Sequence, residues 1–210
     1  MLVFGAKGLA KEVLEVVKQN RKLNKLAFFD NISIEFPEKL YGKFNIIKND
    51  EDAVKYFSNI DSHFTIGVGG PKIREHAFNK FISLGGIPIN LISNTSTIGS
   101  YGVELGVGIN IMQQVVITND IKIGNGCLIN QLSSIGHDVE IGNFVEVCPG
   151  VAISGNCKIG NHSFLGTNST ILPQVTIGKN VIVGAGAVIT KNIPDNCTVV
   201  GIPGKIIKNL

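Results

Sequence analysis

The chain has 210 residues, of which 44% are hydrophobic and 17% charged, and its 25 glycines follow no triplet rule. This composition excludes an intrinsically disordered chain and a collagen-like one. The net charge is only +3 and the lysines are scattered along the chain, so no nucleic-acid partner is expected.

The cysteine spacing and the length of the apolar runs indicate whether the chain binds a metal and where in the cell it is located. The four cysteines show neither a CxxC motif nor the spacing of zinc ligands, which predicts free thiols and no metal. The sequence has no apolar run long enough for membrane insertion, and its opening "MLVFGA" has no basic leader. We therefore expect a soluble, cytoplasmic protein.

Residues 1–92 alternate between strand-like and helix-like segments. The helix expected over residues 9–20 is amphipathic, with Val13, Val16 and Val17 on its apolar face. Strands are expected at residues 2–4, 25–30, 63–69 and 87–93, and further helices at 51–57 and 71–86. This alternation is typical of a parallel sheet with crossover helices, so we expect a small Rossmann-like α/β domain that binds a nucleotide sugar.

Residues 93–210 follow a different rule, a period of six. An aliphatic side chain stands at every sixth position, without a break, from Leu105 to Ile189. This period fits neither an α-helix nor an ordinary hairpin. It is the signature of a parallel β-helix, in which each hexad supplies one short strand and one turn. We expect an all-β second half whose aliphatic residues point inward and stack from coil to coil.

The hexads, the His-Asp dipeptide at 137–138 and the stretches "GAKGLAKEV", "FFDN" and "VVGIPGK" resemble the hexapeptide-repeat bacterial sugar acetyltransferases. That family includes N-acetyltransferases of nucleotide-linked 4-amino sugars and sialic acid O-acetyltransferases, and the resemblance covers essentially the whole chain. It implies a left-handed β-helix and a homotrimer with active sites between neighbouring prisms. It also implies acetyl-CoA as co-substrate, a nucleotide-linked amino sugar as acceptor, no metal, and a role in surface glycan (O-antigen) biosynthesis.

The repeat places Gly155 beside His137. Residues eighteen apart should lie one above the other, about 4.8 Å apart, so the backbone of Gly155 is expected one coil above His137. A glycine leaves its N–H accessible beside the imidazole, and acyl transfer needs a base next to such a donor. The resemblance implies that His137 is the catalytic base, that Asp138 orients its ring and that Gly155 N–H binds the thioester carbonyl. It also implies that Asn130 lines the same cleft.

The chain departs from the family pattern at two histidine positions. Glu146 stands in "FVEVCPG" where the family often has a histidine, and Leu9 replaces the histidine of the family's "GGHA". We expect Glu146 either to contact the substrate or to be an ordinary turn residue. The change at Leu9 removes one contact to the diphosphate or the sugar. Without the resemblance, His137 itself would be interpreted as a solvated turn residue.

Small residues are expected to continue the corner of Gly155 along the prism and to line the pantetheine arm of acetyl-CoA. They are Gly166, Thr167, Gly184 and Ala185. Lys205, after the last coil, is expected either to meet the phosphates of CoA or to be a solvated lysine. Thiolates attack thioesters, but Cys148 and Cys157 have no histidine at an adjacent coil position and are interpreted as buried packing.

The first half offers a site for the nucleotide. The stretch "GAKGLA" joins a strand to a helix, where backbone N–H groups can cradle phosphates; a plain strand–helix turn is the alternative. It is not the GxGxxG fingerprint, so a dinucleotide cofactor is disfavoured. Asp30, at the carboxyl end of the second strand, is expected to contact a ribose or base edge, or else to cap a turn. The expected substrate-binding residues here are Gly5, Lys7, Gly8, Asp30, Gly69 and Lys72.

The sequence predicts an acetyl-CoA-dependent N-acetyltransferase. We expect it to act on the 4-amino group of a UDP- or dTDP-linked 4-amino-4,6-dideoxy sugar, by direct attack in a ternary complex. The nearest alternative is an O-acetyltransferase of the sialic acid type, whose acceptor is a sugar hydroxyl. An alternative from another class is a non-catalytic trimeric β-helix that serves as a scaffold or a nucleotide-sugar sensor.

Overall fold

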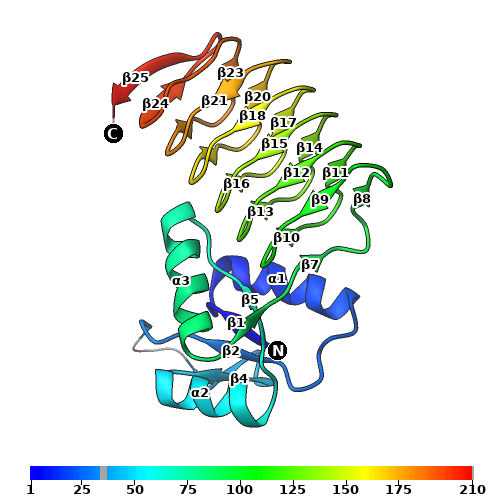
Figure 1. Ribbon diagram of the computed structural model, residues 1–210. Coiled ribbons are helices and arrows are strands. Elements are labelled where there is room, and N and C mark those ends of the chain that lie inside the picture. The colour runs from blue at the N-terminus through cyan, green and yellow to red at the C-terminus, as the bar shows by residue number, and fades with distance from the viewer. Residues whose placement is uncertain (34–36, 210) are drawn as a thin grey trace.

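The first half of the chain builds a sheet with helices on both faces. The computed structural model describes residues 1–33 and 37–209. The elements of this half are β1 (Leu2–Phe4), α1 (Gly8–Gln19), β2 (Ala27–Phe29), β3 (Lys39–Leu40), β4 (Phe44–Ile47), α2 (Asp50–Asn59), β5 (His63–Ile66), α3 (Pro71–Ser83) and β6 (Ile87–Pro88). The strand order is β3-β4-β2-β1-β5-β6. Helix α1 packs on one face and α2 and α3 on the other (Figure 1), which confirms the small parallel α/β domain.

The structure differs from the expectation at its shortest strands. Strands β3 and β4 form an antiparallel hairpin, and β4 also pairs in parallel with β2. Only Leu40, Phe44 and Ile46 of this hairpin are buried, so its alternation is too short for a clear strand signal. The strand expected over 87–93 is divided: β6 completes the sheet, whereas β7 (Leu91–Ile92) opens the β-helix.

Helix α1 lies between the sheet and the first coils of the β-helix. Its buried residues are Ala10, Val13, Leu14, Val16 and Val17, a stripe at helical spacing. The same apolar cluster includes Leu91, Met112 and Leu128 from the β-helix. Beyond the last turn, Nδ2 of Asn20 donates to the backbone oxygen of Ile92 (2.9 Å). The apolar face of one helix thus joins the two halves of the chain, and each such side chain contributes about 1.5–3 kcal/mol when fully buried.

The second half is a parallel β-helix with three faces, each a sheet whose strands pair with those one coil before and after. The docking face, which meets the α/β domain, holds β7, β10 (Asn110–Ile111), β13 (Leu128–Ile129), β16 (Glu146–Val147), β19 (Phe164–Leu165) and β22 (Ile182–Val183). The second face holds β8 (Thr97–Ile98), β11 (Val116–Ile117), β14 (Ser134–Ile135), β17 (Ala152–Ile153), β20 (Thr170–Ile171) and β23 (Val188–Ile189). The third face holds β9 (Glu104–Leu105), β12 (Lys122–Ile123), β15 (Glu140–Ile141), β18 (Lys158–Ile159) and β21 (Thr176–Ile177). Strands β24 (Cys197–Val200) and β25 (Lys205–Asn209) extend the docking face.

The predicted row of aliphatic residues forms the core of this prism. Every member from Leu105 to Ile189 is buried except Leu105, which packs partly buried against the same cluster. A second inward row, two positions earlier in each hexad, was not predicted; it includes Val115, Cys127 and Val145. Most of its members are smaller than isoleucine and some are serines, so this row has a weaker sequence signal.

Each turn of the prism contains one residue in the left-handed backbone region. Positive φ recurs at every sixth residue from Gly102 to Gly186 and includes Asp138 (φ 58°). Glycine, asparagine and aspartate tolerate this conformation best. Because the turn repeats, a residue at any corner stacks on its counterpart eighteen residues later, as Ile111 pairs with Ile129. The repeat and its corners form the left-handed β-helix expected from the sequence.

The prism extends away from the α/β domain, so the last strands lie far from the N-terminus (Figure 1). Helix α3 lies beside the docking face: a Cβ on Gly108 would be 2.5 Å from the ring of Phe78, and Gly70 bonds to Glu146. None of the helices described here is long and apolar enough to cross a membrane.

Candidate active site

His137 and Asp138 form a hydrogen-bonded pair at an exposed corner. They follow β14, between the second and third faces. Nδ1 of His137 lies 2.7 Å from Oδ2 of Asp138, and the two side chains are 65% and 54% exposed. An ionised carboxylate only accepts hydrogen bonds, so the pair holds the proton on Nδ1 and leaves Nε2 as an acceptor. The nitrogen that can take a proton is therefore the one not bonded to Asp138.

Gly155 lies directly against this imidazole. Strands β14 and β17 pair in register, Ile135 with Ile153, so the residues that follow them occupy one corner on successive coils. A Cβ on Gly155 would be 2.6 Å from both Cε1 and Nε2 of His137. Any other residue at position 155 would displace the ring. This stacking agrees with the eighteen-residue period of the sequence.

The N–H of Gly155 is unpaired. It donates no hydrogen bond to any residue that the structure describes, although both of its chain neighbours donate to backbone oxygens. At another corner, by contrast, Oδ1 of Asn143 caps the N–H of Asn125 (2.8 Å). An unpaired donor beside a base is the arrangement that stabilises an oxyanion.

The residues expected to line the pantetheine arm lie at a different corner. Gly166 and Thr167 follow β19 and Ala185 follows β22, both strands of the docking face. They therefore stand between the docking and second faces. The expectation that they continue the corner of Gly155 is wrong, because a coil has three corners and the step of eighteen from Gly155 leads to Pro173.

Asn130 belongs to this other corner. With Gly166 it forms a stack of residues eighteen apart, the Asn130–Gly166 column, which also contains Cys148. Asn130 is buried, and Gly166 is packed so closely that a Cβ would be 2.7 Å from the backbone nitrogen of Ala185. Thr167 and Ala185 are exposed beside the column, and Lys205 is exposed on β25. One prism thus presents two separate columns of expected site residues.

The cysteines are packed rather than reactive. The free thiols of Cys127, Cys148, Cys157 and Cys197 are all buried. Burial raises the pKa of Cys127 and of Cys148 to about 12, and the charge of Glu146 acts in the same direction on Cys148. Thiols that are protonated near neutral pH are poor nucleophiles. The geometry therefore favours direct transfer over a cysteinyl intermediate.

A cavity of about 330 Å³ lies at the carboxyl ends of β1, β2 and β5. It brings together five of the residues expected to bind substrate: Gly5, Lys7, Gly8, Asp30 and Gly69. Ligands of parallel α/β sheets bind at this edge. Lys72, in contrast, lies in the first turn of α3 and lines a separate cavity with Phe164 and Ile182.

The N-terminus of α1 contributes to the wall of the 330 Å³ cavity. It has neither a side-chain cap nor an acidic residue in its first turn. Helix α2 differs, because Asn49 caps it and three acidic residues follow. Uncapped N–H groups and the helix dipole favour an anion such as a diphosphate. A Cβ on Gly8 would meet nothing within 4 Å, so the space in front of this turn is open.

Asp30 is held in the same cavity by its own loop. Its Oδ1 accepts from the N–H groups of Ile32 (3.1 Å) and Ser33 (3.0 Å), and its Oδ2 accepts from the hydroxyl of Ser33 (2.9 Å). Partial burial raises the pKa of Asp30, but the bonds from Ser33 and Ile32 and the charge of Lys7 outweigh burial and lower it. The carboxylate is therefore ionised and held in place. It caps the turn that follows β2 and also lies in the wall of the cavity, so both positions expected from the sequence are occupied by one side chain.

Glu146 faces the α/β domain. It is only 7% exposed, and its Oε2 accepts from the N–H of Gly70 at 2.5 Å. A Cβ on Gly69 would be 3.2 Å from its Oε1. Both carboxylate oxygens thus lie against the loop that precedes α3, not in an open turn.

Arg74 was not recognised from the sequence, although it is fully buried between the domain and the prism. A signal was present, because Arg74 shares a helical stripe with Ala77, Phe78 and Phe81, the other buried residues of α3. An arginine on an apolar stripe indicates a buried, hydrogen-bonded charge.

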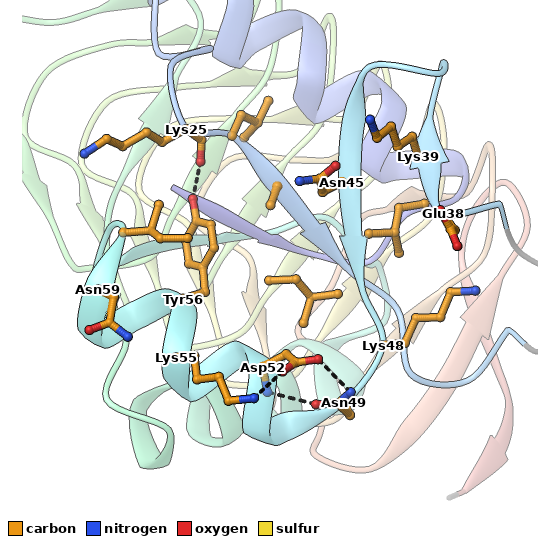
Figure 2. A pocket seen from close by; sticks show the side chains of 15 residues that line it. Lys25, Glu38, Lys39, Asn45, Lys48, Asn49, Asp52, Lys55, Tyr56 and Asn59 are labelled. Carbon is orange, nitrogen blue, oxygen red and sulfur yellow. Dashed lines mark hydrogen bonds and ion pairs between the residues drawn. The ribbon is translucent and has the colours of Figure 1, made fainter.

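A wider cavity, of about 750 Å³, holds none of the expected site residues (Figure 2). It lies beside β4 and α2, with Tyr56 in its wall. Of the two acidic residues that line it, Glu38 and Asp52, Asp52 is paired with Lys55 (2.8 Å) and with Asn49. Within residues 1–33 and 37–209, moreover, no three His, Cys, Asp or Glu side chains gather as a metal site requires.

Family models match both halves of the chain. Residues 1–81 match the PglD N-terminal domain, and residues 156–191 match the bacterial transferase hexapeptide (six repeats). No curated protein sequence matches.

Three solved structures are similar over nearly their full length. A histidine-to-asparagine mutant of perosamine N-acetyltransferase from Caulobacter crescentus, in complex with CoA and GDP-perosamine, is 26% identical (99% of this chain, 96% of that chain, TM-score 0.91). The acetyltransferase domain of PglB from Neisseria gonorrhoeae FA1090 is 29% identical (98% of each chain, TM-score 0.87). WeeI from Acinetobacter baumannii AYE is 30% identical (98% of each chain, TM-score 0.87).

The prism of hexads and the His137–Gly155 corner define a hexapeptide-repeat acyltransferase. Within that class, the chain belongs to the family of sugar acetyltransferases that use acetyl-CoA and carry a PglD-type N-terminal domain.

Proposed function

We propose that this enzyme transfers the acetyl group of acetyl-CoA to the amine of a nucleotide-linked amino sugar, with His137 as the general base. One observation carries the proposal: Nε2 of His137 is a free acceptor beside the unpaired N–H of Gly155. The acceptor we favour is the 4-amino group of a 4-amino-4,6-dideoxy sugar linked to UDP or dTDP. Because one relative was crystallised with GDP-perosamine, GDP belongs in any test of the nucleotide.

The reaction is a direct attack. The amine nitrogen forms a bond to the thioester carbonyl carbon while Nε2 of His137 takes a proton from it. The carbonyl oxygen becomes negative and is stabilised by the N–H of Gly155. The C–S bond then breaks, the amide remains on the sugar, and the proton passes from His137 to the departing thiolate of CoA. Asp138 stabilises the imidazolium that exists between these steps.

The cavity at the carboxyl ends of β1, β2 and β5 is the proposed nucleotide site. The uncapped first turn of α1 at Gly8 suits the diphosphate, and the fixed carboxylate of Asp30 suits a ribose hydroxyl or a base edge. Lys7, also in this wall, adds a positive charge near the phosphates.

A homotrimer is supported by the two separate columns. His137 projects from a convex corner and is 65% exposed, so one prism encloses no site around it. The Asn130–Gly166 column lies at another corner of the same prism. A single acetyl-CoA molecule can touch both columns where corners of two neighbouring chains face each other. We place this trimer in the cytoplasm, in the synthesis of a surface glycan such as an O-antigen.

Thiol release from acetyl-CoA tests the chemistry. Wild type is offered UDP-, dTDP- and GDP-linked 4-amino sugars and free sialic acid, and each product is identified by mass spectrometry and NMR. The proposal predicts an amide on one nucleotide-linked amine. An ester on sialic acid would move the enzyme to the O-acetyltransferase alternative, and no turnover with any acceptor would favour a scaffold or sensor.

Mixed trimers test the shared site. His137→Ala removes the proposed base from the His137–Gly155 corner. Ala185→Phe places a bulky side chain on the exposed surface beside the Asn130–Gly166 column. If each site uses columns of two chains, co-expression of the two inactive variants restores part of the activity. If both columns served a site within one chain, the mixture would stay inactive.

A further inference from the structure

Arg74 of α3 is a buried charge whose hydrogen bonds are shared between the two halves of the chain. Its side chain is 0% exposed. Toward the β-helix, Nε donates to the backbone oxygen of Gly126 (2.9 Å) and Nη2 donates to Oδ1 of Asn110 (2.8 Å). Toward its own domain, Nη1 donates to the backbone oxygen of Val68 (2.9 Å). A buried guanidinium that lost these partners would be left uncompensated, so it fixes their relative positions strongly.

Glu146 of β16 supplies the opposite charge from the side of the prism. Its Oε2 accepts from the N–H of Gly70, the residue that precedes α3. A carboxylate is favoured there because it faces the positive end of a helix dipole. Burial lowers the pKa of Arg74 to about 10, and the charge of Glu146 acts in the opposite direction.

The two tethers bracket one short loop. Arg74 holds the oxygen of Val68, Glu146 holds the N–H of Gly70, and Gly69 lies between them against the carboxylate of Glu146. Val68 and Gly69 are also part of the wall of the 330 Å³ cavity. That cavity is thus fastened to the prism through this loop.

We propose that Arg74 and Glu146 are positioning residues for the acceptor, and we call them the Arg74–Glu146 clasp. They hold the loop Val68–Gly70, and with it the nucleotide, at a fixed place relative to the β-helix that carries His137. The inference rests on the nucleotide site of the proposed function. Glu146 acts on substrate through the loop and does not touch the sugar.

The test compares binding of nucleoside diphosphates with binding of the whole nucleotide sugar. UDP, dTDP and GDP are titrated calorimetrically into wild type, Glu146→Ala and Glu146→Gln. We expect Glu146→Ala to raise the Kd of the nucleoside diphosphate about tenfold, which is the effect of losing one charge-assisted hydrogen bond. Glu146→Gln should recover part of this loss, because its amide oxygen can still accept from Gly70. The KM for acetyl-CoA should change by no more than about twofold in both variants, which corresponds to ~0.4 kcal/mol of binding free energy.

Glu140 is the matched control. It opens the preceding strand of the prism, β15, but its side chain is exposed and, among the described residues, is paired only with Lys158 (3.2 Å). Glu140→Ala and Glu140→Gln should leave nucleoside diphosphate binding unchanged. Arg74→Lys keeps the charge but loses the fork of donors, and it should weaken the same binding in protein that thermal unfolding shows to be folded.

The outcomes separate the clasp from the function on which it rests. Unchanged nucleoside diphosphate binding in Glu146→Ala, with altered kinetics only for the whole nucleotide sugar, would mean that Glu146 contacts the sugar and would overturn the clasp. Failure of wild type to bind any of the three diphosphates would overturn it too. If wild type binds a diphosphate that Glu146→Ala binds weakly, but no acceptor is acetylated, the clasp stands and the proposed chemistry fails.

Discussion

The imidazole of His137 rests on the α-carbon of Gly155, one coil further along the prism. A Cβ at position 155 would be 2.6 Å from Nε2, the nitrogen that Asp138 leaves free. The proposed base and the proposed oxyanion donor are thus brought together by the repeat itself, because eighteen residues return the chain to the same corner. Gly166, Thr167 and Ala185 follow strands of the docking face and lie at a different corner of the same prism.

Gly155→Ala should inactivate the enzyme without unfolding it. The backbone at this position is not in the left-handed region, so alanine is tolerated, but its methyl group displaces the ring. We expect kcat to fall about a hundredfold, as expected for a misplaced base and donor, with KM values little changed. Steady-state kinetics and thermal unfolding check this. Ser154→Ala, at the preceding position, should retain full activity; equal activity in both variants would refute the arrangement.

Asp138→Asn should lower kcat about tenfold to a hundredfold, because an amide fixes neither the tautomer nor the imidazolium. Asp120→Asn is its control. Asp120 occupies the same turn position one coil earlier, with positive φ like Asp138, but it follows Asn119 instead of a histidine. Steady-state kinetics on the two variants should therefore differ sharply. Parallel losses would mean that the aspartates serve the turn and not the base.

Gly8→Ala should separate stability from substrate binding. The new methyl group meets no atom within 4 Å, and alanine is favoured over glycine in a helix by up to about 1 kcal/mol. We expect a slightly higher Tm together with a KM for the nucleotide sugar raised about tenfold, because the methyl group occupies the space for the diphosphate. The KM for acetyl-CoA is the internal reference. An unchanged KM for the nucleotide sugar would place the diphosphate elsewhere.

Alkaline pH should destabilise the protein through Cys127. Burial raises the pKa of this thiol from 9.0 to about 12, so between these values the unfolded chain has lost a proton that the folded chain keeps. Stability is therefore complete below pH 9 and falls as pH rises toward 12, by about 1.4 kcal/mol per pH unit for this group. Denaturant unfolding at several pH values should show a shallower fall for Cys127→Ala. Parallel curves for variant and wild type would contradict the assignment.

The prism was predictable because its signal repeats. One aliphatic residue in six defined the inward row from Ile111 to Ile189, and the same period placed Gly155 on His137. The parallel α/β domain followed from ordinary helical and strand periods. The hairpin β3–β4 did not, because two and four residues carry too little alternation.

The site was predictable only where a local rule applied. The residues of the cavity at the carboxyl ends of β1, β2 and β5 follow strands, and parallel strands end at one edge, so Gly5, Asp30 and Gly69 do lie together. Gly166 lies at a different corner from Gly155 because the separation of the two residues is not a multiple of eighteen. The bond from Gly70 to Glu146 spans 76 residues between two domains, and no period or motif predicts such a contact.

The most direct test of the account is the single-turnover rate of acetyl transfer in His137→Ala, measured with the best acceptor and saturating acetyl-CoA. Binding of both substrates should match wild type, since the imidazole lies at an exposed corner. We predict a rate at least about a hundredfold lower, the usual contribution of a general base, and partial recovery at alkaline pH, where the amine loses its proton unaided. A rate within a few-fold of wild type would contradict the central claim that His137 is the base.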